Sequence, residues 1–238
     1  MNIVITGGSS GLGKALVEAC ASAGHQVLFT YCRRMSEAQV LTNKYTNVRA
    51  IQMDLTDEQS VDMFIQCLTN EQVDVLINNA YAGTALGSHF HKTAPEDFAL
   101  SFNWNVMPVI KITQACVQGM RKRKFGKIVN IITSSVMDAP PTGYAVYTAT
   151  KAYIRQLSKS WSKELGRFNI TSNCILPDYM QTNFEKMEDF QLDQMRNAHP
   201  LKTLLKPEEV ADIIVRLLDA TQQLNGVEIP VNAAQHIV

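Results

Sequence analysis

A tyrosine and a lysine four positions apart, Tyr147 and Lys151, are the residues of this sequence best suited to proton chemistry. The stretch around them has a helical pattern, and residues four apart on a helix share a face. An ammonium beside a phenol stabilises the phenolate, so it lowers a tyrosine pKa that starts near ~10. Such a pair could act as a general acid and base near neutral pH. Tyr and Lys also occur at this spacing by chance, so the pair needs support from other residues.

A serine, Ser134, precedes Tyr147 by thirteen residues and follows an apolar run of strand length at 127–133. Catalytic groups of α/β proteins collect beyond the carboxyl ends of parallel strands. We therefore expect Ser134 to lie beside Tyr147 and to donate a hydrogen bond to a substrate oxygen. Tyr144, one helical turn before Tyr147, is a second candidate for substrate contact.

A glycine-rich segment at residues 6–13 follows the first apolar run and opens directly into a helical pattern. Its glycines allow a tight turn and a close approach of the backbone to a pyrophosphate, and the N-terminus of a helix offers free N–H groups. No Gly-Lys-Ser/Thr closes the segment, so it is not a Walker loop. The alternatives are a dinucleotide site and a plain turn between a strand and a helix.

Seven short apolar runs rich in Val and Ile alternate with longer amphipathic stretches along the whole chain. This alternation predicts an α/β fold, a Rossmann-like doubly wound parallel seven-stranded sheet with helices on both faces, in a three-layer sandwich. No repeat or linker interrupts it, so residues 1–238 are expected to form a single domain. The expected strands are residues 2–6, 26–31, 48–53, 73–78, 127–133, 170–176 and 227–231, and the expected helices are 13–23, 35–45, 57–69, 95–124, 144–168 and 207–220.

The composition excludes several classes of protein. With 22 basic and 22 acidic side chains the net charge is zero, which offers no footprint for nucleic acid or an anionic membrane. Five cysteines without a Cys-x-x-Cys pair, and histidines without ligand spacing, predict neither a disulfide framework nor a metal site. No run reaches the ~20 apolar residues of a membrane span, and the first six residues lack signal-peptide features. We therefore expect a cytoplasmic protein.

In their order and spacing, these residues resemble the short-chain dehydrogenase/reductase family, single-domain branch, over essentially the whole chain. Residues 6–13 resemble the cofactor loop Thr-Gly-x-x-x-Gly-x-Gly of that family, and Asn78-Asn79-Ala80 resembles its Asn-Asn-Ala-Gly element. The catalytic residues that the resemblance implies are Asn105, Ser134, Tyr147 and Lys151.

The resemblance also implies a nicotinamide dinucleotide. Asp54 and Leu55 match the site of the adenine, and Pro177 and Thr182 match the loop that meets the nicotinamide carboxamide. The full set of expected cofactor residues is Gly7, Ser9, Ser10, Gly11, Leu12, Gly13, Arg33, Arg34, Asp54, Leu55, Asn79, Ala80, Tyr147, Lys151, Pro177, Met180 and Thr182.

The implied reaction is hydride transfer between the nicotinamide and a carbonyl or secondary alcohol. In it Tyr147 is the acid/base, Ser134 polarises the oxygen, Lys151 lowers the tyrosine pKa and holds ribose hydroxyls, and Asn105 holds a proton-relay water. Residues 126–131 and 200–211 resemble 3-oxoacyl-(acyl-carrier-protein) reductases, which favours a ketoreductase whose substrate is a small carbonyl compound or a carrier-bound acyl group. The alternatives are an alcohol or sugar dehydrogenase working oxidatively and a dinucleotide-sensing regulator, although a sensor would need no acid/base set.

The end of the second expected strand favours NADP(H), with NAD(H) possible as a second cofactor. NAD-selective sites place an acid there for the ribose 2′-hydroxyl, but here Arg33 and Arg34 follow the strand and the nearest acid is Glu37. Two guanidiniums could bind a 2′-phosphate, or they could merely begin the next helix in solvent. Ser10, where NADP enzymes of the family often carry a basic residue, adds no support.

Three departures from the family pattern affect the site and the assembly: Tyr81 and Asp178 each replace a glycine, and Asn232-Ala233-Ala234 replaces an Asp-Gly-Gly. A homodimer or homotetramer is expected, because residues 95–124 carry apolar side chains beyond one stripe, among them Val106, Val109, Ile110, Ile112, Ala115 and Val117. The substrate determinants are expected in the loops at 81–93, 136–144 and 179–200.

Overall fold

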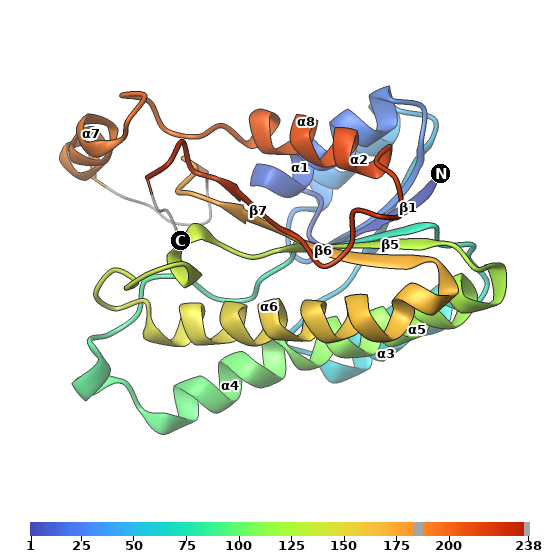
Figure 1. Ribbon diagram of the computed structural model, residues 1–238, viewed down its shortest axis with the longest axis horizontal. Helices are drawn as coiled ribbons and strands as arrows, with labels where there is room; N and C mark the ends of the chain where they lie inside the picture. The colour runs from blue at the N-terminus through green and yellow to red at the C-terminus, as the bar shows by residue number, and fades with distance from the viewer. Residues whose placement is uncertain (183–187, 236–238) are drawn as a thin grey trace.

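The sheet that positions the site is described by a computed structural model, which places residues 1–182 and 188–235. Within these residues seven strands, all parallel, lie in the order β3-β2-β1-β4-β5-β6-β7 (Figure 1). The strand order reverses between β1 and β4, which confirms the expected doubly wound, Rossmann-like sheet. The strands are β1 (Asn2–Ile5), β2 (Gln26–Tyr31), β3 (Val48–Gln52), β4 (Val75–Asn78), β5 (Gly126–Ile131), β6 (Ile170–Pro177) and β7 (Glu228–Val231).

Helices cover both faces of the sheet and complete the three layers that Figure 1 shows. One face is covered by α1 (Gly11–Ser22), α2 (Met35–Lys44) and α8 (Pro207–Leu218), and the other by α3 (Glu58–Leu68), α4 (Pro95–Asn105), α5 (Met107–Arg123) and α6 (Ala145–Leu165).

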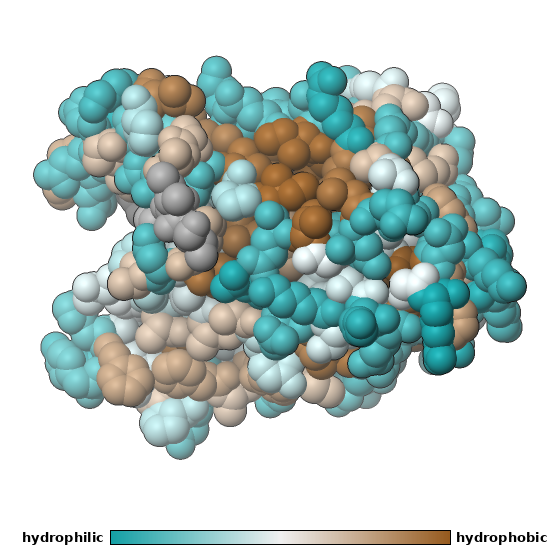
Figure 2. Space-filling view, viewed as in Figure 1, coloured by the Kyte–Doolittle hydropathy of each residue, from teal (hydrophilic) through white to brown (hydrophobic). Residues whose placement is uncertain are grey.

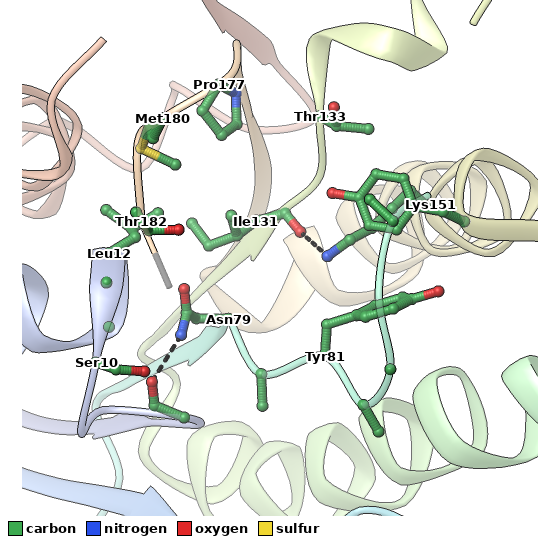
Figure 3. A pocket seen from close by; sticks show the side chains of 18 of the residues that line it. Ser10, Leu12, Asn79, Tyr81, Ile131, Thr133, Lys151, Pro177, Met180 and Thr182 are labelled. Carbon is green, nitrogen blue, oxygen red and sulfur yellow. Dashed lines mark hydrogen bonds between the residues drawn. The ribbon is translucent and has the colours of Figure 1, made fainter. Parts of the chain in front are cut away.

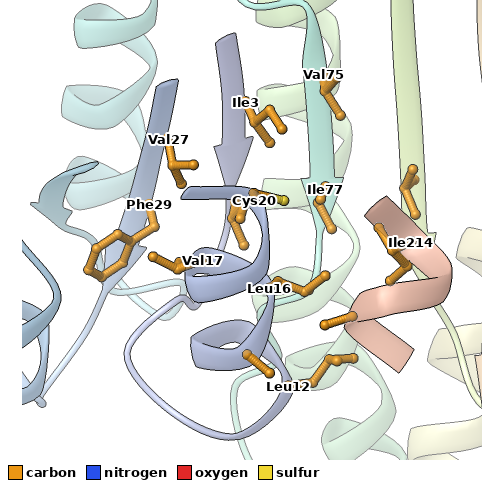
Figure 4. Packing of buried hydrophobic residues seen from close by; sticks show 14 of the residues in the cluster. Ile3, Leu12, Leu16, Val17, Cys20, Val27, Phe29, Val75, Ile77 and Ile214 are labelled. Atoms are coloured by element: carbon orange, nitrogen blue, oxygen red, sulfur yellow. The ribbon is translucent and has the colours of Figure 1, made fainter. Parts of the chain in front are cut away.

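The core under α1 and α8 fixes the two central strands from which the site extends. Leu16 of α1 and Ile214 of α8 pack with Ile3, Val75 and Ile77 of β1 and β4 (Figure 4). Each such side chain contributes roughly 1.5–3 kcal/mol when fully buried. The loops that leave the carboxyl ends of β1 and β4 therefore start from rigid positions.

The expected single helix over residues 95–124 is wrong, because two helices, α4 and α5, meet at Val106. Pro108 explains the break. A proline inside a helix has no N–H to donate, and its ring clashes with the carbonyl four residues earlier, here that of Trp104. At the first turn of a new helix the same proline is tolerated. The break leaves Asn105 at the carboxyl end of α4.

A helix that the sequence analysis did not predict, α7 (Asp189–Ala198), lies within the expected loop at 179–200. Residues 183–187 of that loop lie outside the described residues. The sequence of α7 gave little indication of a helix, because Leu192 is the only one of its residues that is buried. In Figure 1 α7 stands at one end of the sheet, beyond the end of α8.

The surface in Figure 2 is mostly hydrophilic, with apolar side chains gathered over α8 and β7. In residues 1–182 and 188–235 no helix has both the length and the apolar character needed to cross a membrane.

Candidate active site

A cavity of about 740 Å³ lies at the carboxyl edge of the sheet, where β1, β4, β5 and β6 end. Its walls are built by the loops after these strands and after β2 and β3, and by the start of α6 (Figure 3). Met195 and Ala198 of α7 also line it. Small-molecule sites in proteins measure roughly 300–1,000 Å³, so this cavity has the size of a ligand site. All the expected cofactor residues line it, including Ser9, Leu12, Leu55, Ala80 and Met180.

The glycine-rich loop after β1 makes a tight turn into α1. Gly7 has φ +72°, and a Cβ on Gly13 would lie only 1.9 Å from the Gly7 carbonyl oxygen, so side chains are excluded there. The α1 helix begins at Gly11 with no acidic residue in its first turn and no side-chain cap from Ser10. Its first N–H groups and positive dipole end therefore face the cavity without a competing carboxylate. This segment fits the pyrophosphate of a dinucleotide.

The far end of the cavity is polar and carries both signs of charge. Asp54, Arg33 and Arg34 line it together. The Thr56 backbone N–H donates to the Asp54 carboxylate at 2.9 Å and is the main reason that the pKa of Asp54 lies below its usual value. Arg34 makes a 3.5 Å contact with Glu37 while its side chain stays 40% exposed, so this guanidinium can still reach an added anion.

At the other end, Tyr147 and Lys151 project from the first two turns of α6 into the cavity. The Lys151 ammonium donates to the Ile131 carbonyl at 2.7 Å (Figure 3), and the residue is 4% exposed. Burial lowers the pKa of Lys151 to about 8. Its Nζ lies 5.9 Å from the centroid of the Tyr147 ring. The geometry thus pairs a phenol with a desolvated cation.

Ser134 does not line the cavity, and this departs from the expectation. Its side chain is 1% exposed and donates to the Asp178 carboxylate at 3.1 Å. Thr133 and Ser135 line the cavity instead, and Thr133 Oγ1 donates to Ser135 Oγ at 3.3 Å.

The backbone changes direction at this point. Thr133 has extended backbone (φ −167°, ψ 149°) and lies on the cavity wall with Ile131 and Ile132, whereas Ser134 begins a short 3₁₀ turn and bonds to Asp178. Counting thirteen residues back from Tyr147 carries no information about the side that a residue faces. Arg155 helps to hold the segment, because it donates to the Val136 carbonyl and bridges to Glu228 at 2.6 Å.

Asn105 also lies behind the cavity wall, where it is 1% exposed. Its Oδ1 accepts from the Ala82 backbone N–H at 2.6 Å and its Nδ2 donates to the Ala82 carbonyl at 3.1 Å. Both ends of the amide therefore bind the loop after β4. The same loop is fixed to β1, since Asn79 Nδ2 donates to the Thr6 and Gly7 carbonyls.

Several cavity residues had no assigned role in the sequence analysis, among them Tyr81, Thr133, Asp178 and His199. Tyr81 and Asp178 were visible as departures from glycine. His199 follows α7, an unexpected helix, and its Nδ1 accepts from the Leu201 N–H at 3.2 Å. Tyr144 lines the cavity as expected, and its ring packs edge-to-face on Tyr147 with centroids 6.1 Å apart. Among the described residues no group of three His, Cys, Asp or Glu could hold a metal ion.

Comparison with known proteins gives consistent matches. A model of the family described as short chain dehydrogenase matches residues 1–192. The chain is 29% identical to the 3-oxoacyl-(acyl-carrier-protein) reductase FabG of Aquifex aeolicus, covering 96% of this chain and 94% of that protein. It is also 29% identical to the acetoacetyl-CoA reductase of Shinella zoogloeoides, covering 99% and 98%.

A solved structure agrees in fold. The 3-ketoacyl-(acyl-carrier-protein) reductase of Brucella melitensis, complexed with NADH, matches with a TM-score of 0.89 over 99% of this chain and 98% of that one. At 23% identity this match speaks for the fold alone.

Proposed function

This chain belongs to the short-chain dehydrogenase family, and on that premise we propose that it is an NADP(H)-dependent ketoreductase. The observation that carries the proposal is the Tyr147–Lys151 pair at one end of a cavity whose other wall is the glycine-rich loop. When bound, the cofactor supplies the hydride. Proteins similar to this chain include reductases named for 3-oxoacyl-(acyl-carrier-protein) and acetoacetyl-CoA, which supports a 3-oxoacyl compound as substrate.

Tyr147 donates the proton that a reduced carbonyl oxygen needs. The buried Lys151 ammonium favours the resulting phenolate, because a nearby positive charge stabilises a negative one. Thr133 replaces Ser134 in our assignment as the hydroxyl that polarises the substrate oxygen, since Thr133 lines the cavity and Ser134 is buried behind it. Asn105 is assigned a positioning role for the loop at Ala82.

The residues proposed to hold the cofactor follow the length of the cavity. The loop at residues 7–13 holds the pyrophosphate and Asp54 the adenine, while Arg33 and Arg34 bind a 2′-phosphate, which supports NADP(H) over NAD(H). Asn79, Pro177 and Thr182 surround the nicotinamide end.

Apolar side chains also line the cavity. They include Tyr144, whose ring packs on Tyr147, and Tyr179, Met195, Ala198 and Leu204. They suit the hydrocarbon part of an acyl group, which supports a substrate with an apolar chain next to its ketone.

We also propose that the chain forms one domain, assembles as a homodimer or homotetramer and works in the cytoplasm. All five cysteines are unpaired, which supports a reducing compartment.

The test is loss of nicotinamide absorbance when the protein is mixed with NADPH and acetoacetyl-CoA, followed by longer 3-oxoacyl thioesters and by simple ketones. We expect thioesters to be reduced with the highest kcat/KM. A parallel series of secondary alcohols and sugars with NADP⁺ measures the oxidative direction. Turnover of sugars alone, or of no carbonyl compound at all, would overturn the proposal.

A further inference from the structure

Tyr81 stands in the loop after β4, where the family pattern has a glycine, and its side chain lines the cavity next to Lys151 (Figure 3). A glycine at this position would leave the space beside the lysine to water. In this chain an aromatic ring fills it.

The ring contacts both members of the acid/base pair. It packs edge-to-face on the Tyr147 ring, with centroids 5.0 Å apart and planes at 76°. The Lys151 ammonium lies 5.4 Å from the Tyr81 centroid, closer than its 5.9 Å to the Tyr147 centroid. A cation within about 6 Å of a ring centroid is attracted to the ring face, and more strongly where water is excluded.

A chain of hydroxyl groups links the far end of the ring to α4 and α6. Tyr81 Oη lies 3.2 Å from Ser101 Oγ on α4, and Ser101 Oγ lies 2.9 Å from Thr150 Oγ1 on α6. Asn105 Nδ2 reaches the same Ser101 oxygen at 3.5 Å. Burial raises the pKa of the Tyr81 phenol, so it stays neutral where Lys151 titrates.

The groups around the ammonium come from four elements. They are the Ile131 carbonyl of β5, Tyr147 of α6, Tyr81 of the loop after β4 and Cys174 of β6. Burial raises the pKa of the Cys174 thiol to about 11, so it is uncharged near neutral pH. The positive charge is therefore stabilised by one carbonyl and two aromatic rings, without a carboxylate among these partners.

We propose that Tyr81 is a positioning residue whose ring holds Lys151 in its charged form and so extends the pH range over which Tyr147 works as an acid. The inference rests on the proposed acid/base role of the pair. It makes the ring, and not the hydroxyl, the part of Tyr81 that matters.

The test titrates Lys151 in the cofactor-free protein by NMR of ¹³C-labelled lysine, with its resonance identified by its loss in Lys151→Met. Tyr81→Phe keeps the ring and should titrate like the wild type. Tyr81→Leu keeps an apolar side chain without a ring and should titrate about one pH unit lower. Tyr81→Met provides a second ringless variant in case the leucine variant does not fold.

Tyr144→Leu is the matched control, because it removes a ring that packs on Tyr147 and should leave the Lys151 titration unchanged. If a carbonyl substrate is turned over, the fall of kcat/KM at alkaline pH should begin at a lower pH in the ringless variants, by the same amount as the shift of the Lys151 titration. Because the titration needs no turnover, it remains informative if the proposed reaction fails.

Ringless variants that titrate like the wild type, or at higher pH because water enters, would overturn the inference. So would a phenylalanine variant that shifts as far as the leucine variant.

Discussion

Lys151 carries its charge at a site where desolvation opposes it, and this governs the pH dependence of the proposed reaction. Burial lowers the lysine pKa to about 8, so the folded protein loses this proton more readily than an unfolded chain does. Below that pH the ammonium is present and favours proton release from Tyr147. Above it the charge is lost, and the phenol becomes a weaker acid.

We therefore expect kcat/KM for carbonyl reduction to be high near pH 7 and to fall as the pH rises through about 8. A pH–rate profile taken at saturating NADPH measures this fall of kcat/KM at alkaline pH. A profile that stays flat to pH 10 would show that the charge of Lys151 does not matter to the reaction.

We predict different effects for substitutions of the two neighbours Thr133 and Ser134. Thr133→Val keeps the shape of the side chain and removes its hydroxyl, so kcat should fall by roughly 10²- to 10³-fold, as for a lost oxyanion donor. Ser134→Ala breaks the bond to Asp178 and should have a much smaller effect. Steady-state kinetics of the two variants decide between them, and a severe loss confined to Ser134→Ala would restore the assignment made from spacing.

The difference between these two residues shows how far the sequence can predict the site. The glycine loop, Tyr147 and Lys151 each belong to a local pattern of fixed spacing, whereas Asp54 was expected only from the family resemblance; all of them line the cavity. Ser134 was placed by a count across the irregular segment between β5 and α6. Tyr81 and Asp178 could be recognised as unusual, but their partners Ser101 and Ser134 lie 20 and 44 residues away along the chain.

At the scale of elements, the end of β2 determines the choice of cofactor. The strand ends at Tyr31, and Arg33 and Arg34 follow it on the cavity wall before α2 begins at Met35. The guanidinium closest to an acid, Arg34, is only loosely paired with Glu37 and remains available to a phosphate.

We expect the wild type to prefer NADPH. In Arg33→Ala/Arg34→Ala the ratio of kcat/KM with NADPH to kcat/KM with NADH should fall by roughly 10- to 150-fold, the equivalent of one charge-assisted hydrogen bond. The measurement is kcat/KM with both cofactors. A wild type that prefers NADH, or an unchanged ratio in the double variant, would refute the role of the arginines. Glu37→Gln is a useful control, because it frees Arg34 and should leave the preference intact or raise it.

The break between α4 and α5 was not predicted from the apolar periodicity of the sequence. Apolar periodicity continues across residues 95–124, so it predicted one helix, and the effect of Pro108 on the backbone outweighed the pattern. The break has a use, because it ends α4 at Asn105 and lets the amide reach both polar groups of Ala82.

At the scale of the molecule, half of the apolar residues that suggested an oligomer are buried. Val106, Val109 and Ile112 are at most 6% exposed, because α4, α5 and α6 pack on one another and on the sheet. The other three, Ile110, Ala115 and Val117, are partly buried. On α4, α5 and α6 the exposed large apolar side chains are Leu100, Met107 and Tyr153, between 37% and 46% exposed.

The prediction of a symmetric assembly therefore rests on these three exposed side chains. A two-fold axis that pairs this face with itself would bury it in both subunits. Sedimentation at micromolar concentration should give the mass of two or four chains, and Leu100→Glu/Tyr153→Glu should reduce it. A wild-type mass of one chain would contradict the prediction.

The architecture itself was the most predictable part. All seven strands lie within a residue or two of the expected ranges, because strands covered on both faces are continuously apolar. Helix α7 was not predicted, because it buries a single residue and its sequence therefore shows no periodic apolar pattern.

The central claim is that Tyr147, with its phenol paired to Lys151, is the acid/base of an NADPH-dependent carbonyl reduction. The most direct test compares kcat/KM for acetoacetyl-CoA in the wild type and in Tyr147→Phe, with NADPH affinity measured by fluorescence titration in both. The substitution removes one hydroxyl, so NADPH should bind with nearly unchanged Kd while turnover falls by roughly 10²- to 10⁴-fold, the usual contribution of a general acid. A phenylalanine variant that keeps a tenth or more of the wild-type activity would contradict the account.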